Sequence, residues 1–245
     1  MFKAAIFDID GTLILTDHAG IRALAFTLSI HDNSMPHDRL PFDYSPHGKT
    51  DPLIFRELFQ RIYQREPTNE EHESLKTTYL NRLPHEMRNS EKGYRIMPGV
   101  LNLLAALKES GCELGLGTGN FSEGARIKLE PGDLNRWFRF GGYGDDSENR
   151  AEMIRAAIRR GRELIGRLDP EECVVLGDTT RDIDAAREAG AAVIGVATGM
   201  HSVEELATAD LAVPTLASPE VYRFIGLPSA SDQKKLSQGA CVNAA

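Results

Sequence analysis

The sequence predicts an α/β protein with a mainly parallel sheet, helices on both faces, and a helical segment inserted after the first strand. Short apolar runs recur along the chain, with helical segments between them. The runs are almost continuously apolar rather than alternating, as expected for strands that are buried on both faces. Residues 16–91, between the first two runs, are helical in character and too long for a simple crossover.

Five apolar runs are predicted to be strands. Each is followed by a polar or glycine-containing segment, which marks the end of the strand. The runs are residues 3–7, 112–116, 138–142, 173–176 and 192–196.

Apolar residues spaced three and four apart predict two helices that pack on this sheet. Pro98 and Gly99 precede the first helix and Gly111 follows it, as is usual at helix ends. The two stripes are Val100, Leu103, Leu104 and Leu107, and Ile154, Ala157, Ile158, Gly161 and Ile165.

Three further helices are predicted within residues 16–91, the third beginning at a capping box, residues 68–71. We predict that residues 16–91 form a small helical cap inserted into an α/β core of residues 1–15 and 92–228. Residues 229–245 are polar and rich in small side chains, and we predict a mobile tail there. The three stripes are Ile21, Leu24, Ala25 and Leu28; Phe55, Leu58, Phe59 and Ile62; and Leu75, Tyr79 and Leu83.

Charge and composition restrict the class of function. The 245-residue chain has a formal net charge of -8, which argues against binding to nucleic acid or to an anionic membrane. No apolar run approaches the roughly 18 residues that a membrane-spanning helix needs, and no signal peptide is visible. Cys112, Cys173 and Cys241 are scattered without metal-ligand spacing, so we expect a reducing, cytoplasmic location.

Polar side chains follow the ends of three predicted strands. Asp8 and Asp10 follow the first, Thr118 follows the second, and Asp178 and Asp182 follow the fourth. The carboxyl ends of parallel strands meet at one edge of a sheet, where open α/β sheets place their active sites. We therefore expect these side chains to converge on one crevice.

These residue types suit phosphoryl transfer. Asp8 would be ionised at neutral pH and needs no base to act as a nucleophile. Mg²⁺ prefers oxygen ligands, which Asp8 and Asp178 can supply. Asp10 would lie back over the site if the chain turns at Gly11, and could protonate the leaving group. Arg150, at the start of a helix, would supply fixed positive charge.

The chain resembles the haloacid dehalogenase superfamily. The resemblance rests on the run Asp8-Ile9-Asp10-Gly11-Thr12-Leu13, on the threonine that ends the second strand, on a base, and on Gly177-Asp178-x-x-x-Asp182. The motifs span residues 6–184, and the layout is most similar to the phosphoglycolate phosphatase-like branch, with a helical cap after the first motif. This resemblance implies a three-layer Rossmann-like core with the five strands in the order 5-4-1-2-3.

The resemblance also implies roles for individual residues. Asp8 becomes the nucleophile that forms a phosphoaspartate, and Asp10 the acid/base whose backbone carbonyl also binds Mg²⁺. Asp178 becomes a metal ligand, and Asp182 an outer ligand or an orienting carboxylate. Thr118 and Arg150 complete the catalytic set. The predicted phosphate- and substrate-binding residues are Gly11, Thr12, Gly119, Asn120, Lys49 and Thr50, the last two in a cap segment, residues 47–51, that resembles the substrate-facing region of relatives.

The basic motif departs from the family pattern. That position is usually lysine, often followed soon by proline, whereas residues 147–152 read Ser-Glu-Asn-Arg-Ala-Glu. We favour Arg150 for this role because it keeps the charge, although its head group is longer and planar. Lys128 is the alternative, but it comes soon after Thr118 and better suits the solvated side of a helix.

We expect a Mg²⁺-dependent phosphatase that acts on a small phosphorylated metabolite, with 2-phosphoglycolate or a sugar phosphate as candidates. Thr12 favours a phosphatase over the alternative, a phosphosugar mutase of the β-phosphoglucomutase type, which often carries valine there. A dehalogenase would not need Asp10 or the metal carboxylates, and a phosphonate hydrolase would need a cap lysine, for which Lys49 is the early candidate. A non-enzymatic phosphoaspartate switch is a further alternative, but receiver domains are shorter and lack a cap.

Overall fold

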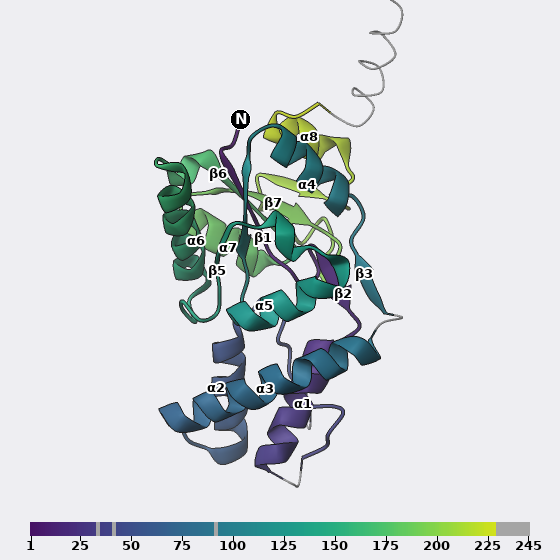
Figure 1. Ribbon diagram of the computed structural model, residues 1–245, viewed down its shortest axis with the longest axis vertical. Helices are drawn as coiled ribbons and strands as arrows, with labels where there is room; N and C mark the ends of the chain where they lie inside the picture. Colours follow the sequence, from purple (N-terminus) through teal and green to yellow (C-terminus); the bar gives the residue numbers. More distant parts are fainter. Residues whose placement is uncertain (33–34, 41–42, 91–92, 229–245) are drawn as a thin grey trace, which may run out of the picture.

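A computed structural model gives the structure of this protein (Figure 1). It describes residues 1–32, 35–40, 43–90 and 93–228. The predicted mobile tail, residues 229–245, and Cys241 lie outside the described residues, as does the predicted junction at 91–92.

A six-stranded parallel sheet forms the centre of the α/β unit. Its order is β5-β4-β1-β6-β7-β8, which confirms the predicted order 5-4-1-2-3 as seen from the opposite edge. β8 extends the sheet by one strand that was not predicted, because three residues are too few for a periodic pattern to show. The strands are β1 (Ala4–Phe7), β4 (Glu113–Gly117), β5 (Phe140–Gly142), β6 (Cys173–Gly177), β7 (Ala192–Val196) and β8 (Leu211–Val213).

Helices cover both faces of the sheet and make three layers, as predicted (Figure 1). Alternate residues of β1 show how the layers form. Ala5 and Phe7 pack with α4 (Val100–Glu109), α5 (Ser122–Leu129) and α8 (Pro219–Ile225). Ala4 and Ile6 pack with α6 (Arg150–Ile165) and α7 (Thr180–Glu188) on the other face. The strand is thus buried on both sides, which explains its continuous apolar run.

Three helices follow the first strand and lie together beyond the end of the sheet (Figure 1). They are α1 (Ala19–His31), α2 (Asp51–Tyr63) and α3 (Asn69–Asn89). Between the sheet and these helices, β2 (Ile14–Thr16) and β3 (Tyr94–Ile96) form a small antiparallel pair that holds the two ends of the segment side by side. This pair was not predicted.

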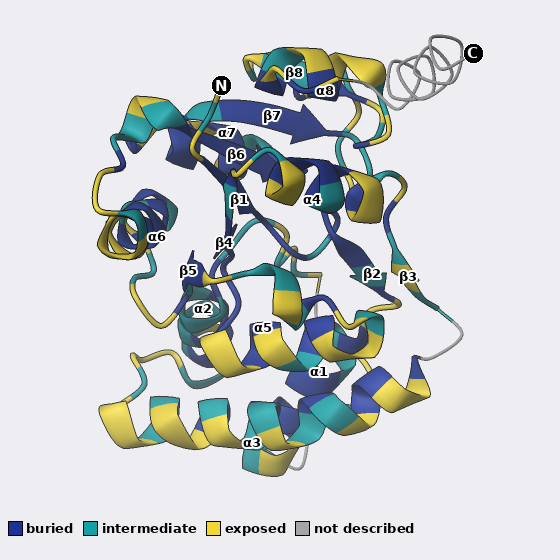
Figure 2. Ribbon diagram, turned by 45° about the horizontal axis from the view of Figure 1, so that its top comes forward, coloured by how far each residue is buried: buried dark blue, intermediate teal, exposed yellow. Residues whose placement is uncertain are grey.

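The three helices share an apolar core of their own. Residues from the three predicted stripes, among them Leu28, Leu58 and Leu83, are buried together. Phe121, from the loop that follows β4, packs into the same cluster. The predicted capping box is present: the Glu71 N–H donates to Thr68 Oγ1 at 3.2 Å, and the Thr68 N–H donates to Glu71 Oε2 at 2.8 Å. Figure 2 shows the buried strands and the exposed outer faces of α3 and α6.

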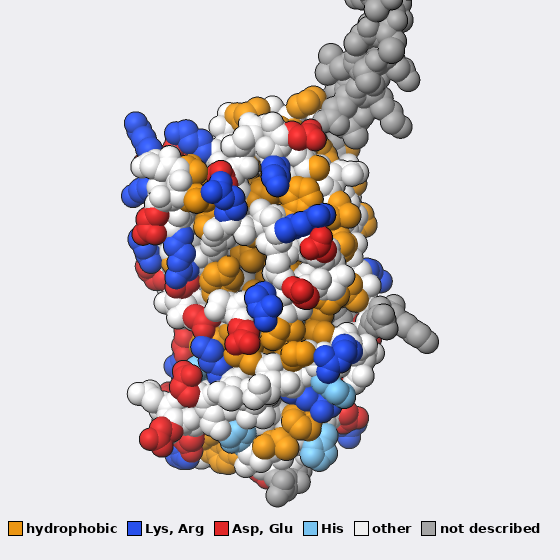
Figure 3. All heavy atoms as spheres, in the orientation of Figure 1, with side chains coloured by type: hydrophobic (Ala, Val, Ile, Leu, Met, Phe, Trp, Pro, Cys, Tyr) orange, Lys and Arg blue, Asp and Glu red, His pale blue; other side chains and the backbone are white. Residues whose placement is uncertain are grey.

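The described surface carries charge of both signs. On the face drawn in Figure 3, acidic and basic side chains are interspersed over the α/β unit and over the helical segment. Of the helices described, none has both the length and the apolar character needed to cross a bilayer.

Two leucines of α4 offer a matched test of how this helix packs. Leu103 is fully buried against the sheet, whereas Leu101 on the same helix is 46% exposed. We expect Leu103→Ala to lower the free energy of unfolding by about 2–5 kcal/mol, because it removes buried methyl groups and leaves a cavity. Leu101→Ala should change it by less than about 0.5 kcal/mol. Urea denaturation of both variants is the measurement, and equal losses would contradict this packing.

Candidate active site

The site is built on the carboxyl end of β1. The Asp8 N–H donates to the carbonyl of Leu176 in β6 at 2.9 Å, so the sheet ladder continues one residue past the strand. This bond holds Asp8 at the edge of the sheet, where only 6% of its surface is exposed. β4 ends next to it, and there the Thr118 N–H donates to the carbonyl of Gly142 at 3.1 Å. The parallel sheet therefore brings the predicted strand-end residues to one edge.

Three carboxylates meet at this edge. One oxygen each from Asp8, Asp178 and Asp182 lies within 4.8 Å of the others, and all three side chains are buried. Burial, together with the charges of Asp182 and Asp10, raises the pKa of Asp8 to about 7, although Arg150 opposes the shift. Burial and the charges of Asp182 and Asp8 also raise the pKa of Asp178 well above its ordinary value. Such a cluster of like charges favours the binding of a cation.

Two glycines let the backbone come close to Asp178. Gly11 has φ +87°, and a Cβ on it would lie 2.4 Å from Asp178 Oδ2. A Cβ on Gly199 would lie 1.7 Å from the same oxygen. Thr12 Oγ1 donates to Asp178 Oδ1 at 3.4 Å, so this predicted phosphate-binding hydroxyl is directed at a predicted metal ligand. The sequence analysis did not identify Gly199 as a residue of the site.

Arg150 joins two of the carboxylates. It is the first residue of α6, whose N-cap Asn149 accepts the Ala151 N–H at 2.8 Å. Its Nη2 lies 3.1 Å from Asp8 Oδ1, and its Nε donates to Asp182 Oδ1 at 3.0 Å. Burial opposes the charged form, but the charges of Asp182 and Asp8 raise the pKa of Arg150 above its ordinary value. The guanidinium thus stays positive beside the predicted nucleophile.

The expectation that Lys128 is solvated is wrong. Lys128 is 6% exposed, and its Nζ donates to Asp10 Oδ2 at 2.7 Å and to Asn120 Oδ1 at 2.6 Å. The side of α5 that carries it packs between the edge of the sheet and α3 instead of facing water (Figure 1). Lys128 lies three residues after the buried Ala125 and next to the buried Leu129, a stripe position that could have indicated burial.

Asp10 therefore has its own cationic partner. Its carboxylate accepts hydrogen bonds from Lys128 and, at 2.8 Å, from Asn120 Nδ2. Burial opposes ionisation, but the charge and hydrogen bond of Lys128 lower the pKa of Asp10. Asn120 Nδ2 also donates to Thr118 Oγ1 at 2.8 Å. The predicted phosphate-binding Asn120 thus connects the predicted acid/base to the predicted Thr118 hydroxyl.

The predicted substrate-facing segment, residues 47–51, lies directly on the strand-end loop after β4. A Cβ on Gly119 would lie 2.4 Å from the Lys49 carbonyl, so only glycine permits this approach. The Asp51 N–H donates to the Gly119 carbonyl at 2.7 Å, and Asp51 Oδ2 accepts the Phe121 N–H at 2.9 Å. Burial raises the pKa of Asp51 to about 6, opposed by Lys128. The sequence analysis placed Asp51 in the segment of residues 47–51 that resembles a substrate-facing region, but it did not predict the contact of Asp51 with the loop after β4.

Lys49 and Thr50 have protein partners. Lys49 Nζ pairs with Glu57 Oε2 at 2.6 Å, so the Glu57 carboxylate already engages this amine. Thr50 is buried, and its hydroxyl donates to the Glu148 carbonyl at 3.3 Å. Their predicted contact with substrate stays a prediction.

Comparison with known proteins identifies the family. A family model described as haloacid dehalogenase-like hydrolase matches residues 2–190. A relative named as a probable phosphatase, IndB of Dickeya dadantii, is 30% identical, and the match covers 86% of this chain and 87% of the relative. The chain therefore belongs to the haloacid dehalogenase-like hydrolases, as the resemblance indicated. With its curated phosphatase relatives, the protein is an enzyme of the phosphatase type.

Other relatives agree. The phosphoglycolate phosphatase of Escherichia coli K12 is 26% identical over 95% of this chain and 96% of its own. The structure of CbbY from Rhodobacter sphaeroides with phosphate matches with a TM-score of 0.68 at 23% identity, covering 89% of this chain and 96% of that one. A predicted phosphatase from Clostridium acetobutylicum matches with a TM-score of 0.67 at 22% identity, covering 92% and 98%. These two structures show the fold.

The carboxylates fit a divalent metal ion, which this family generally uses. The cluster offers oxygen donors from Asp8, Asp178 and Asp182, which suits a hard cation such as Mg²⁺. The side chain of Asp10 accepts hydrogen bonds from Lys128 and Asn120 and is not part of this cluster, and the metal contact that the family resemblance implies for its backbone carbonyl stays a prediction.

The carboxylate cluster predicts an unusual pH dependence of stability. The folded protein binds protons more tightly than the unfolded chain, since the pKa of Asp8 rises from 3.8 to about 7 and that of Asp178 rises too. The free energy of unfolding contributed by this pair should therefore fall as pH rises through that window. In EDTA, the thermal midpoint should decline from pH 5 to pH 8, and Mg²⁺ should restore it most at pH 8.

Asp178→Asn should flatten this decline, raise the metal-free midpoint at pH 8 and remove the response to Mg²⁺. Asp184→Asn is the control, because it changes the same charge at an exposed position of α7. If the two variants behave alike, repulsion within the cluster does not limit stability.

Proposed function

We propose that the protein is a Mg²⁺-dependent phosphatase that hydrolyses a small phosphate monoester through a phosphoaspartate on Asp8. The observation that carries the proposal is the arrangement of Asp8, Asp178 and Asp182 within 4.8 Å of one another, with the Arg150 guanidinium on Asp8. A nucleophilic carboxylate, two further anionic ligands and a fixed cation are the parts that phosphoryl transfer to aspartate needs. Mg²⁺, when bound, would offset the charge between these carboxylates and the phosphate ester.

In the first step, Asp8 attacks the phosphorus while the bond from phosphorus to the leaving oxygen breaks. Asp10 gives its proton to that oxygen. Lys128 favours ionised Asp10, but an anionic ester bound beside Asp10 raises the pKa of that carboxyl again. In the second step, Asp10 accepts a proton from water, which attacks the phosphoaspartate and releases phosphate. For this step Lys128 keeps Asp10 in the ionised form that is required.

Positive charge and hydrogen-bond donors surround the transferred group. Arg150 stays charged and is held in place by Asp182, so it stabilises charge on the phosphoryl group without moving. The Thr118 hydroxyl accepts from Asn120, which leaves its own proton to donate to a phosphate oxygen. The Gly119 N–H is the second proposed donor.

We propose that residues 16–91 act as a cap over this site. The contacts that would open and close are those of residues 47–51 with the strand-end loop, where Asp51 exchanges hydrogen bonds with Gly119 and Phe121. A closed cap excludes water until the phosphoenzyme has formed. The buried, unpaired thiols of Cys112 and Cys173 fit a reducing, cytoplasmic location.

The proposed substrate class is a small phosphorylated metabolite such as 2-phosphoglycolate or a sugar phosphate. The first candidate is supported by the named activity of relatives, including the phosphoglycolate phosphatase of Escherichia coli K12. The second is supported by CbbY, whose structure holds xylulose 1,5-bisphosphate in a variant form.

The first test is hydrolysis of p-nitrophenyl phosphate with Mg²⁺, with EDTA, and by Asp8→Asn. We expect release of p-nitrophenol that needs Mg²⁺ and that falls by about 10⁴-fold or more in Asp8→Asn, since the nucleophile is lost. Release by Asp8→Asn at the wild-type rate would rule out the phosphoaspartate. Isomerisation of a sugar 1-phosphate without release of phosphate would favour the mutase, and a long-lived phosphoprotein would favour the switch.

The roles of the two buried cations, Lys128 and Arg150, should be distinguishable by comparing esters with different leaving groups. Lys128→Met should slow hydrolysis of an alkyl phosphate by about 10²-fold, but slow that of p-nitrophenyl phosphate less, because p-nitrophenol leaves without a proton from Asp10. Arg150→Met should slow both equally, by about 10²- to 10³-fold, because it stabilises the transferred group. Steady-state kinetics with the two esters measure these ratios.

Lys108→Met, at an exposed position of α4, controls for the loss of a lysine. Equal losses on both esters in Lys128→Met would contradict the assignment of Lys128 to Asp10. A mild defect in Arg150→Met would contradict the choice of Arg150 for the basic motif.

A further inference from the structure

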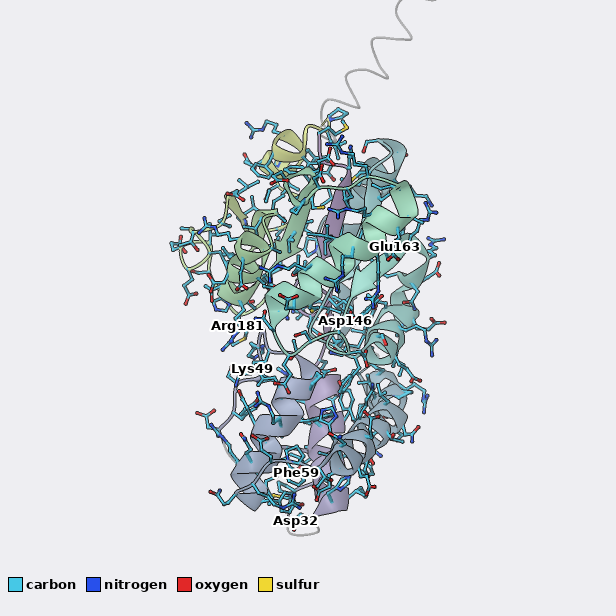
Figure 4. All side chains as sticks on the ribbon, turned by 90° about the vertical axis from the view of Figure 1, so that its left-hand side faces the viewer. Asp32, Lys49, Phe59, Asp146, Glu163 and Arg181 are labelled. Carbon is cyan, nitrogen blue, oxygen red and sulfur yellow. The ribbon has the colours of Figure 1, made fainter. Side chains whose placement is uncertain are left out.

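A cavity of about 470 Å³ lies where the cap meets the start of α7. Its walls come from the segment of residues 43–49, from Arg61 of α2, and from Thr179 to Arg181 of the α/β unit. Figure 4 shows Lys49 and Arg181 near one another at this junction. None of the reaction steps above uses this cavity.

The cavity adjoins the carboxylate cluster. Thr179, in its wall, directly follows the predicted metal ligand Asp178, and its hydroxyl donates to Asp182 Oδ2 at 2.7 Å. His47, also in the wall, is close enough for the charge of Asp10 to act on its pKa, which burial lowers overall. Thr179 and His47 therefore form a border between the cavity and the carboxylate cluster.

The walls of the cavity are positively charged, although the whole chain carries a net charge of -8. Lys49, Arg61 and Arg181 line it, together with one carboxylate, Asp43. Glu57 offsets the charge of Lys49 through their ion pair at 2.6 Å. Arg61 donates to the backbone carbonyl of Asp43 at 3.1 Å, so its guanidinium is held at the wall of the cavity.

Arg181 is the cation of this group that belongs to the α/β unit. Across the described ranges of the chain, no hydrogen bond or ion pair is found for its exposed guanidinium, although its charge acts at a distance on Glu57. Its stem is held against the cap: a Cβ on Gly48, which has φ +69°, would lie 2.8 Å from Arg181 Cδ and 2.9 Å from Thr179 Oγ1. Gly48 thus lets the side chain of Arg181 lie along the cap segment and reach the cavity.

We propose that this cavity binds a second anionic group of the substrate, with Arg181 as its main ligand and Arg61 as a second cation. The substrate is then a phosphate ester with a distal carboxylate or phosphate. The inference rests on the proposed function, because it places the transferred phosphoryl group at Asp8. Either a carboxylate or a phosphate would pair with a guanidinium through charge-assisted hydrogen bonds. Experiment can distinguish the two, because substrates that carry one or the other can be compared.

The test compares matched esters. 2-Phosphoglycolate is paired with ethyl phosphate, which lacks the carboxylate, and ribulose 1,5-bisphosphate with ribulose 5-phosphate, which lacks the second phosphate. Within at least one pair, the wild type should prefer the ester with two anionic groups by about ten- to a hundred-fold in kcat/KM. The preferred pair identifies the distal group.

Arg181→Gln should remove most of this preference, chiefly by raising KM for the ester with two anionic groups. Arg159→Gln, which removes the same charge from an exposed position of α6, should keep the preference. A wild type that hydrolyses the esters without preference within either pair, or an Arg181→Gln variant that keeps the wild-type preference, would overturn the inference and leave the phosphatase proposal standing.

Binding tests the cavity without turnover. Calorimetry with Asp8→Asn and Mg²⁺ should show tighter binding of the preferred ester with two anionic groups than of its matched partner. The same measurement on Asp8→Asn with Arg181→Gln should lose the difference. If this binding difference is present but the wild type hydrolyses none of the esters, the proposed function fails and the anion site stands. If the binding difference is absent, the anion site fails.

Discussion

The confinement of three carboxylates at one buried edge of the sheet is the constraint on which the rest of the site depends. Asp8, Asp178 and Asp182 repel one another where water cannot screen them, and the raised pKa values of Asp8 and Asp178 express that cost. The fold compensates only in part, through Arg150. Gly11 provides the space for Asp178. A bound cation would reduce the repulsion that remains. The stability of the folded protein and its proposed function therefore depend on the same carboxylates.

The two buried cations are assigned to different halves of the chemistry. Arg150 contacts Asp8 and Asp182, the predicted nucleophile and its neighbour. Lys128 contacts Asp10, the predicted acid/base, and Asn120. The choice between Arg150 and Lys128 for a single basic position is therefore replaced by two positions with two electrostatic roles. A single cation placed between Asp8 and Asp10 could not stabilise the nucleophile and adjust the acid/base independently.

The helical segment contacts the α/β unit through a loop that brings residues to both sides of the strand-end edge. Asp51 binds the strand-end loop next to Thr118, while Gly48 packs on Thr179 and Arg181. Movement of this loop would change the environment of Asp10 and the shape of the neighbouring cavity together. Selectivity for substrate and protection of the phosphoenzyme would then depend on the same contacts.

The sequence by itself determined the parallel sheet, its strand order, the helical segment and the convergence of Asp8, Thr118 and Asp178, since these follow from local periodicity and from motifs at strand ends. It did not reveal β8 or the β2–β3 pair, whose strands of three residues form only when a distant partner supplies hydrogen bonds. Tertiary structure alone decided the environment of Lys128, because burial of one side of α5 depends on α3, which is remote in sequence. Tertiary structure also decided that Arg181 faces the helical segment. The cavity beside Arg181 exists only because residues 43–49 and the start of α7, which are remote in sequence, enclose it together.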